Sequence, residues 1–417
     1  MNILLRSATI IDSNSPAIHQ KKRDILIKDG IIQKIASKIN SPKGTKEIKR
    51  DNLHVSLGWF DSSVSFGEPG FEERETISNG LQVAAKSGFT DLVLNPNTKP
   101  TPDTSSDIVF LKERSKDFAT NLYPIGNLTA KGTGEHLAEL FDMQNAGAVA
   151  FYDFKSSLNA NLLKIALLYA QNFNGLVLSY PEELQIKGKG TVNEGEVSTR
   201  LGLKGIPGLS EELQIARDLY ILEYTGGKLH IPTISTAGSV KLIAEAKKKG
   251  LDVTASVAIH NLILSDAELE SFDSNYKVKP PLRTQKDAKA LLKGLQNKTI
   301  DFVTADHTPI DIEQKRVEFD NAEFGSIGLE SAFGALNSEL GIEETIQLVT
   351  KGRERFGIKS PELKEGEAAC FTLFNPDGAY TYERSSIVST SKNSIFIGKQ
   401  LKGVVYGIIN NKKMALD

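Results

Sequence analysis

The chain has 417 residues, which suits one large barrel domain with a small companion domain. Hydrophobic residues make up 40% of it and charged residues 24%, with a formal net charge of -2. No basic block dominates, so neither nucleic acid nor an anionic membrane is expected as a partner. The single cysteine, Cys370, excludes an internal disulfide bond and fits a reducing cytosol.

The N-terminal segment MNILLRSATIID lacks the basic region, apolar stretch and small-residue cleavage site of a secretory signal. No apolar run reaches the roughly 18 residues that a transmembrane helix needs. We therefore expect a cytoplasmic protein.

The first 55 residues are typical of β-structure. Short β-branched runs occupy Asn2–Ile11, Arg23–Ile27 and Ile31–Ile35. Asp29-Gly30, between the last two runs, is a hairpin signal.

From about Ser56 short apolar runs alternate with longer amphipathic stretches. The amphipathic stretches 76–87, 135–146 and 240–249 each stop before a glycine, the usual helix terminator. The expected strands are Leu57–Val64, Thr90–Leu94, Ala119–Ile125, Ala148–Tyr152, Gly175–Ser179, Lys228–Thr233, Asp252–Val257 and Asp301–Thr304. Eight alternating units predict an α/β fold, a closed (β/α)8 TIM-type barrel.

After about Gly366 the sequence again has the pattern of β-strands. The expected strands are Cys370–Phe374, Ile387–Ser389, Ser394–Ile397 and Val404–Ile409. The two β-rich ends are predicted to pair into one small β-sandwich. The predicted domains are therefore a discontinuous sandwich, 1–55 and 365–417, and a barrel, 56–364.

Several long segments resemble dihydroorotase of the bacterial long-chain type, in the amidohydrolase superfamily. LGWFDSSVSFGEPG is similar to the family's PGFIDxHxHLREPG, and NPNT to its MPNT. NEGEVSTRLGLKGIPG, PPLRTQKDAKALLKGL and TIDFVTADHTP also resemble family motifs, as does SKNSIFIGKQLKGVV near the C-terminus. The resemblance spans nearly the whole chain and implies cyclic-amide chemistry in pyrimidine biosynthesis with zinc-activated water.

The same resemblance shows that the imidazole ligands are replaced. The HxH pair of the first barrel strand falls at Ser63 and Ser65, and two further family histidines fall at Ser179 and Thr233. A neutral hydroxyl is a poor zinc ligand. We therefore expect no metal cofactor, and zinc only if the chain is active.

Two carboxylates remain at family positions. Asp306, in TADHTP, matches the metal-bound aspartate that also acts as general base, a role we expect to be vestigial here. Asp153 falls near the position of the bridging carboxylate or carboxylated lysine. A site rebuilt from both, with Asp61, His260 and His307, stays open.

The substrate contacts implied by the family are altered as well. The arginine that grips the substrate carboxylate falls at Gly67, and a histidine with the same task falls at Ile310. Asn97 is retained as a substrate-binding residue, and Lys279 replaces the family's asparagine as the second candidate. Glu182 is expected on a solvated face.

Three functions remain open. The first is a non-catalytic homologue that supports assembly of aspartate carbamoyltransferase, as the resemblance to pseudo-dihydroorotases implies. The alternatives are an active dihydroorotase, interconverting dihydroorotate and N-carbamoyl-aspartate, and a hydrolase with an altered substrate. We also expect a homo-oligomer.

Overall fold

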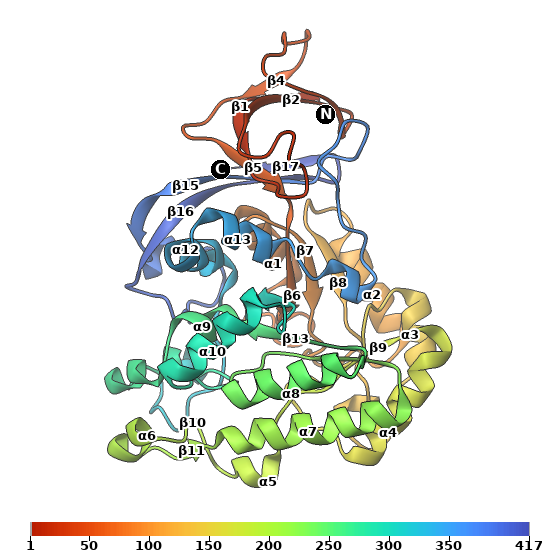
Figure 1. The fold of residues 1–417 in the computed structure, drawn as a ribbon, viewed down its shortest axis with the longest axis vertical. Helices are drawn as coiled ribbons and strands as arrows, with labels where there is room; N and C mark the ends of the chain where they lie inside the picture. Colours follow the sequence, from red (N-terminus) through yellow and green to blue (C-terminus); the bar gives the residue numbers. More distant parts are fainter. Residues whose placement is uncertain (1, 417) are drawn as a thin grey trace.

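In the computed structural model, which describes residues 2–416, the strands of both chain ends form one sheet at one end of the molecule (Figure 1). Its order is β17-β16-β15-β5-β1-β2-β3, with β4 paired to β1. The strands are β1 Asn2–Ile10, β2 Lys22–Lys28, β3 Ile31–Ala36, β4 Lys46–Ile48, β5 His54–Leu57, β15 Phe371–Thr381, β16 Gln400–Asn410 and β17 Lys413–Leu416. The prediction that the two chain ends pair with each other is confirmed, because β5 pairs with β1 on one side and with β15 on the other.

The rest of the chain is a parallel barrel. Its strands are β6 Trp59–Val64, β7 Phe89–Leu94, β8 Asn121–Pro124, β9 Leu176–Leu178, β12 Lys228–Ile231, β13 Val253–Ala258 and β14 Phe302–Thr304. Phe151 bridges Gly126 and Val177 in the fourth position, and a Val64–His307 bridge closes the ring. The eight-unit barrel expected from the sequence is thus confirmed.

Helices surround the barrel (Figure 1). The long ones are α1 Ile77–Lys86, α2 Ser105–Ser115, α3 Leu140–Ala146, α4 Ala160–Ala170, α7 Gly208–Thr225, α8 Ala237–Lys248, α10 Gln285–Gln296, α12 Leu329–Leu340 and α13 Ile342–Val349. Hydroxyl caps start several of them: Thr76 accepts from Asn79 at α1, and Thr236 from Ser239 at α8. Gly147, with φ 111°, ends α3 as the sequence predicts.

The segment between β9 and α7, residues 179–207, contains short elements. They are α5 Leu184–Lys187, β10 Val192–Asn193, α6 Glu196–Leu201 and β11 Gly205–Ile206, and further short helices are α9 Ile259–Ile263 and α11 Ile312–Lys315. Arg283 ties this segment to the barrel by donating to Asn193 Oδ1 and to the Ile206 carbonyl.

Two expected strands, Ile387–Ser389 and Ser394–Ile397, are wrong. Their backbone amides bond to side chains instead of a neighbouring strand: Glu330 accepts from Ser389 N, and Ser326 Oγ accepts from Ile395 N. The residues therefore form a loop, because carboxylate and hydroxyl side chains, and not a neighbouring strand, accept from these backbone amides.

Part of the barrel interior is filled by apolar and aromatic side chains. Phe60, Phe302 and Phe356 pack with Tyr152 and Tyr180 in one buried cluster. His230 stacks on Phe302 and bonds to two hydroxyl groups, which makes it a structural histidine. Within residues 2–416, no helix has the length and apolar character needed to cross a bilayer, and the cytoplasmic location stays a prediction.

Candidate active site at the barrel mouth

Asp306 follows β14 and stands at the mouth with a left-handed backbone, φ 47°. Its carboxylate is 3% exposed, and Oδ2 lies 2.7 Å from the Lys155 ammonium nitrogen. Ser63 Oγ donates to Oδ1 at 3.2 Å. Burial raises the pKa of Asp306, and the positive charge of Lys155 opposes that rise. A lysine therefore stands as the counter-ion of the family's metal-binding aspartate.

A second ion pair lies beside the first. Lys279 Nζ is 2.7 Å from Glu182 Oε2, and it also donates to the Lys155 carbonyl oxygen at 3.0 Å. Burial lowers the pKa of Lys279, and Glu182 opposes the change. The expectation that Glu182 is solvated is wrong, because its residue is 4% exposed. The ammonium groups of Lys155 and Lys279 thus each face a carboxylate at the mouth, and a third ammonium, that of Lys187, lies 3.7 Å from Glu182 Oε2.

The serines at the HxH positions belong to a neutral hydrogen-bond network. Asn95 Nδ2 donates to Ser63 Oγ at 3.1 Å and to Ser65 Oγ at 3.2 Å. Both serines are buried. The amide of Asn95 therefore connects the two positions where the family places imidazoles.

The other family positions have local partners of their own. Ser179 Oγ donates to Asp218 Oδ2 at 2.6 Å, and Thr233 Oγ1 is buried without a partner. Asp153 accepts from two backbone amides and from Thr129 Oγ1 at 2.5 Å. Its carboxylate is thus turned to the loop that follows β8.

These residues do not fit the zinc that the family resemblance implies. Zinc in such sites is held by imidazole, thiolate or carboxylate groups. Across residues 2–416 no three or more His, Cys, Asp or Glu side chains gather in a way that could hold a metal. The hydroxyls of Ser63 and Ser179 donate to carboxylates, and Lys155 puts a positive charge beside Asp306.

The hypothesis of a rebuilt metal site is therefore not supported, because its residues do not gather into a ligand cluster in the described part of the chain. Asp61 accepts from Thr304 Oγ1 and from two backbone amides, and burial raises its pKa to about 7. His260 and His307 are buried, and each has an Nε2 atom without a partner. Among the described residues they do not form a ligand group with the aspartates.

The positions that bind substrate in the family have also lost family side chains, as the metal-binding positions have. A Cβ atom at Gly67 would lie 1.7 Å from the Phe71 carbonyl oxygen, so this loop has no room for the family's arginine. Asn97, on the loop after β7, keeps a buried Oδ1 without a partner. Of the two predicted substrate contacts, Asn97 has a free acceptor, whereas Lys279 is engaged with Glu182.

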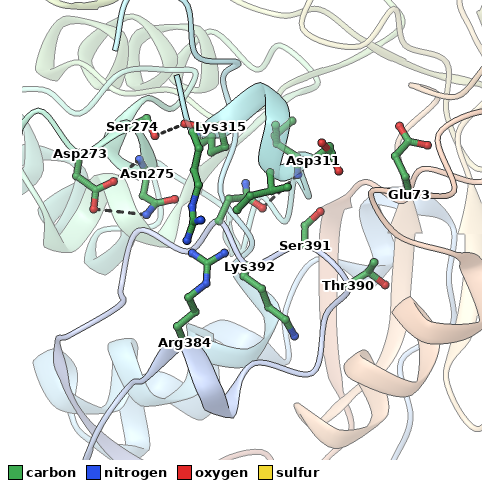
Figure 2. A pocket seen from close by; sticks show the side chains of 14 residues that line it. Glu73, Asp273, Ser274, Asn275, Asp311, Lys315, Arg384, Thr390, Ser391 and Lys392 are labelled. Atoms are coloured by element: carbon green, nitrogen blue, oxygen red, sulfur yellow. Dashed lines mark hydrogen bonds between the residues drawn. The ribbon is translucent and has the colours of Figure 1, made fainter. Parts of the chain in front are cut away.

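A cavity of about 400 Å³ opens beside the mouth, and Ile310 is part of its wall. Figure 2 shows Arg384 reaching into this space below Asn275, with Asp311 and Glu73 on another side. Lys315 is buried in the wall and donates to the carbonyls of Lys277 and Glu323. Burial lowers its pKa to about 7. Acidic and basic groups both line the space, so its charge favours no single ligand class.

The buried histidines predict how stability depends on pH. His307 Nδ1 accepts from the Gly328 amide at 3.2 Å, and burial lowers its pKa to about 3. A folded-state pKa below the unfolded value of about 6.5 gives stability that is present above pH 6.5 and lost toward pH 3. At pH 5 the loss is about 2 kcal/mol for this residue.

We expect His307→Asn, whose Oδ1 can accept from Gly328, to lose less stability than the native chain between pH 7 and pH 5. Urea unfolding at both pH values measures the difference. His136→Asn, at an exposed histidine, is the control. Equal acid sensitivity of native chain and His307→Asn would contradict the assignment.

Sequence reasoning missed three partners: Lys155, Asn95 and Asp218. Lys155 is 151 positions from Asp306, and nothing in its neighbourhood marks it as different from other lysines. Asn95 stands where the family motif has methionine, a signal that could have been used. Asp218 lies in α7, 39 positions from Ser179.

Comparisons agree with the fold and the motifs. A family model described as dihydro-orotase-like matches residues 54–239. The chain is 40% identical to the dihydroorotase of Pelotomaculum thermopropionicum, covering 100% of this chain and 99% of that one. It is 35% identical to the dihydroorotase of Geobacter metallireducens, covering 99% of both.

Among solved structures, the L-hydantoinase (dihydropyrimidinase) of Arthrobacter aurescens superposes with a TM-score of 0.85 at 21% identity, over 99% of this chain and 95% of that one. Dihydropyrimidinase from Brevibacillus agri gives 0.81 at 19% identity, with the same coverage. These two establish the barrel-and-sandwich fold. With the full-length identity to curated relatives, the chain belongs to the dihydroorotase family of amidohydrolases.

Proposed function

We propose that this chain is a non-catalytic member of its family that serves as an assembly partner in pyrimidine biosynthesis. One observation carries the proposal: the Lys155 ammonium lies 2.7 Å from Asp306 Oδ2, where the family places metal. A general base that is ion-paired to lysine and bonded to Ser63 has no free position for water activation. Water without a metal keeps its high pKa, which a single aspartate does not offset.

The test is an assay of the purified chain with dihydroorotate and with N-carbamoyl-aspartate, each with and without added zinc. We expect no turnover above the uncatalysed rate and less than one zinc bound per chain. The dihydroorotase of Pelotomaculum thermopropionicum, assayed in parallel, is the positive control. Zinc-dependent turnover that disappears in Asp306→Ala would overturn the proposal.

The partner is the second part of the proposal. Following the family resemblance, aspartate carbamoyltransferase is the expected partner. Co-elution of the chain with transferase activity from native lysate supports it. Elution of the chain entirely apart from the transferase counts against it.

An active dihydroorotase is the second candidate function, and the names of the curated relatives favour it. Relatives that cover almost the whole chain at 35–40% identity are called dihydroorotase. This candidate requires Lys155 to leave Asp306 when substrate binds. The zinc assay above separates the two candidates. A hydrolase with an altered substrate would appear as turnover of other cyclic amides by the same preparation.

A further inference from the structure

The cavity beside the barrel mouth is lined by charges of both signs that do not pair with each other. Its volume is about 400 Å³, within the range of roughly 300–1,000 Å³ that small-molecule sites occupy. Arg316, Arg384 and Glu73 belong to its lining, and within residues 2–416 no ion pair or hydrogen bond engages these three side chains. Figure 2 shows Arg384 and Glu73 on different sides of the space. Opposite charges are therefore held apart across one cavity.

The other charged groups of the lining have partners inside the protein. Lys315 and Lys392 donate to backbone carbonyl oxygens. Asp273 and Asp311 each accept from the backbone amide two residues further along the chain. Asp311 lies on the same side of the cavity as Glu73 (Figure 2). A ligand in this space therefore meets guanidinium groups without partners on one side and carboxylates on the other.

Hydrogen bonds hold the walls of the cavity in place. Arg74, next to Glu73, donates to Gln314 Oε1 at 2.8 Å and so joins the loop after β6 to α11. Asn393 is buried in the lining and bonds to three backbone groups of the loop after β14. A binding site whose walls are already ordered loses less conformational entropy when a ligand enters.

We propose that this cavity binds a small zwitterion, an amino acid or a dipeptide. Its carboxylate faces Arg384 and Arg316, because a guanidinium group can donate two parallel hydrogen bonds to a carboxylate. Its ammonium group faces Glu73 and Asp311. Ile312 is 40% exposed and belongs to the lining, so it offers an apolar contact to a side chain such as that of leucine.

A ligand with a single charge fits this lining less well. The net charge of the lining selects no ligand, but the separation of its charges does. A simple anion that meets the guanidinium groups shares the cavity with carboxylates, and a simple cation shares it with guanidinium groups; like charges repel more strongly where water is partly excluded. A zwitterion neutralises both sides. The inference does not depend on whether the chain is catalytic, because the ion pairs of Lys155 and Lys279 at the mouth use none of these residues.

Isothermal titration calorimetry of the full chain with L-leucine tests the proposal. We expect L-leucine to bind. Leucinamide, which lacks the carboxylate, and N-acetyl-L-leucine, which lacks the ammonium group, should each bind at least about 10-fold more weakly. L-leucyl-L-leucine, titrated in parallel, distinguishes the two sources of the zwitterion. Tighter binding of the dipeptide identifies a peptide site, and tighter binding of L-leucine identifies an amino-acid site.

Two variants assign the two ends of the ligand. Arg384→Gln should weaken L-leucine at least about 10-fold and leave leucinamide unchanged, because leucinamide has no carboxylate for the guanidinium group. Glu73→Gln should weaken L-leucine and leave N-acetyl-L-leucine unchanged. Both side chains are exposed, so both variants should stay folded, which a thermal melt verifies. Arg23→Gln and Glu135→Gln, outside the cavity, are the matched controls and should bind L-leucine as the native chain does.

Three results would each overturn the proposal. The first is no binding of L-leucine or of the dipeptide up to about 10 mM, a concentration at which even a weak specific site is occupied. The second is equal binding of L-leucine, leucinamide and N-acetyl-L-leucine, which would show that neither charged end is recognised. The third is an equal loss of L-leucine and leucinamide binding in Arg384→Gln.

Discussion

Replacing Lys155 with methionine should lower the free energy of unfolding at pH 7 by about 3–5 kcal/mol, the usual cost of leaving one partner of a buried ion pair alone. The Asp306 side chain is 3% exposed and that of Lys155 is 11% exposed, so water replaces little of the lost interaction. Only Ser63 would still donate to the carboxylate. Urea unfolding followed by circular dichroism gives the value.

The pH dependence of this loss has a defined sign. Without Lys155, burial raises the pKa of Asp306 further above its unfolded value. A folded-state pKa that is raised contributes stability present at low pH and lost as pH rises. The deficit of Lys155→Met should therefore be larger at pH 8 than at pH 5.

Two comparisons make the Lys155 result specific. The double variant Lys155→Met/Asp306→Asn removes both charges and should recover most of the loss. Lys116→Met breaks an exposed pair with Glu113 and should cost less than about 1 kcal/mol. A double variant no more stable than Lys155→Met would show that the side-chain volume of lysine, and not its charge, matters.

Arg353→Met should also cost about 3–5 kcal/mol, because Arg353 is one partner of a second buried ion pair. Arg353 is 1% exposed, and its guanidinium donates to Asp91 Oδ2 at 2.6 and 3.0 Å and to the Gly58 carbonyl at 2.7 Å. It thereby joins the starts of β6 and β7 to the turn at residues 353–356. Its loss leaves Asp91 buried without its charge partner.

Urea unfolding of Arg353→Met at pH 7 measures this effect. Arg200→Met is the matched control, because Arg200 and its partner Glu270 are both more than half exposed. The control should change stability by less than about 1 kcal/mol. Equal effects of the two variants would mean that burial does not determine the strength of the Arg353 interaction.

The barrel could be predicted well because each strand and helix carries its own signal. Runs such as Thr90–Leu94 are continuous and apolar, and glycines such as Gly88 and Gly147 end the helices before the next strand. The segment around residues 387–397 could not be predicted in the same way. Its apolar texture resembles a strand, but its amides bond to Glu330 and Glu75, which come from distant parts of the chain.

The sequence by itself determined that the imidazole ligands of the family are missing from this site, because a residue's identity fixes which atoms it can offer. Ser63, Ser65, Ser179 and Thr233 bring hydroxyl groups to positions where the family has imidazoles, whatever the fold does around them. Only the tertiary structure decided which side chains surround these positions. Closure of the barrel brings Lys155 to Asp306, and a tight turn leaves no space at Gly67, since contacts between distant residues depend on how strands and loops meet in space.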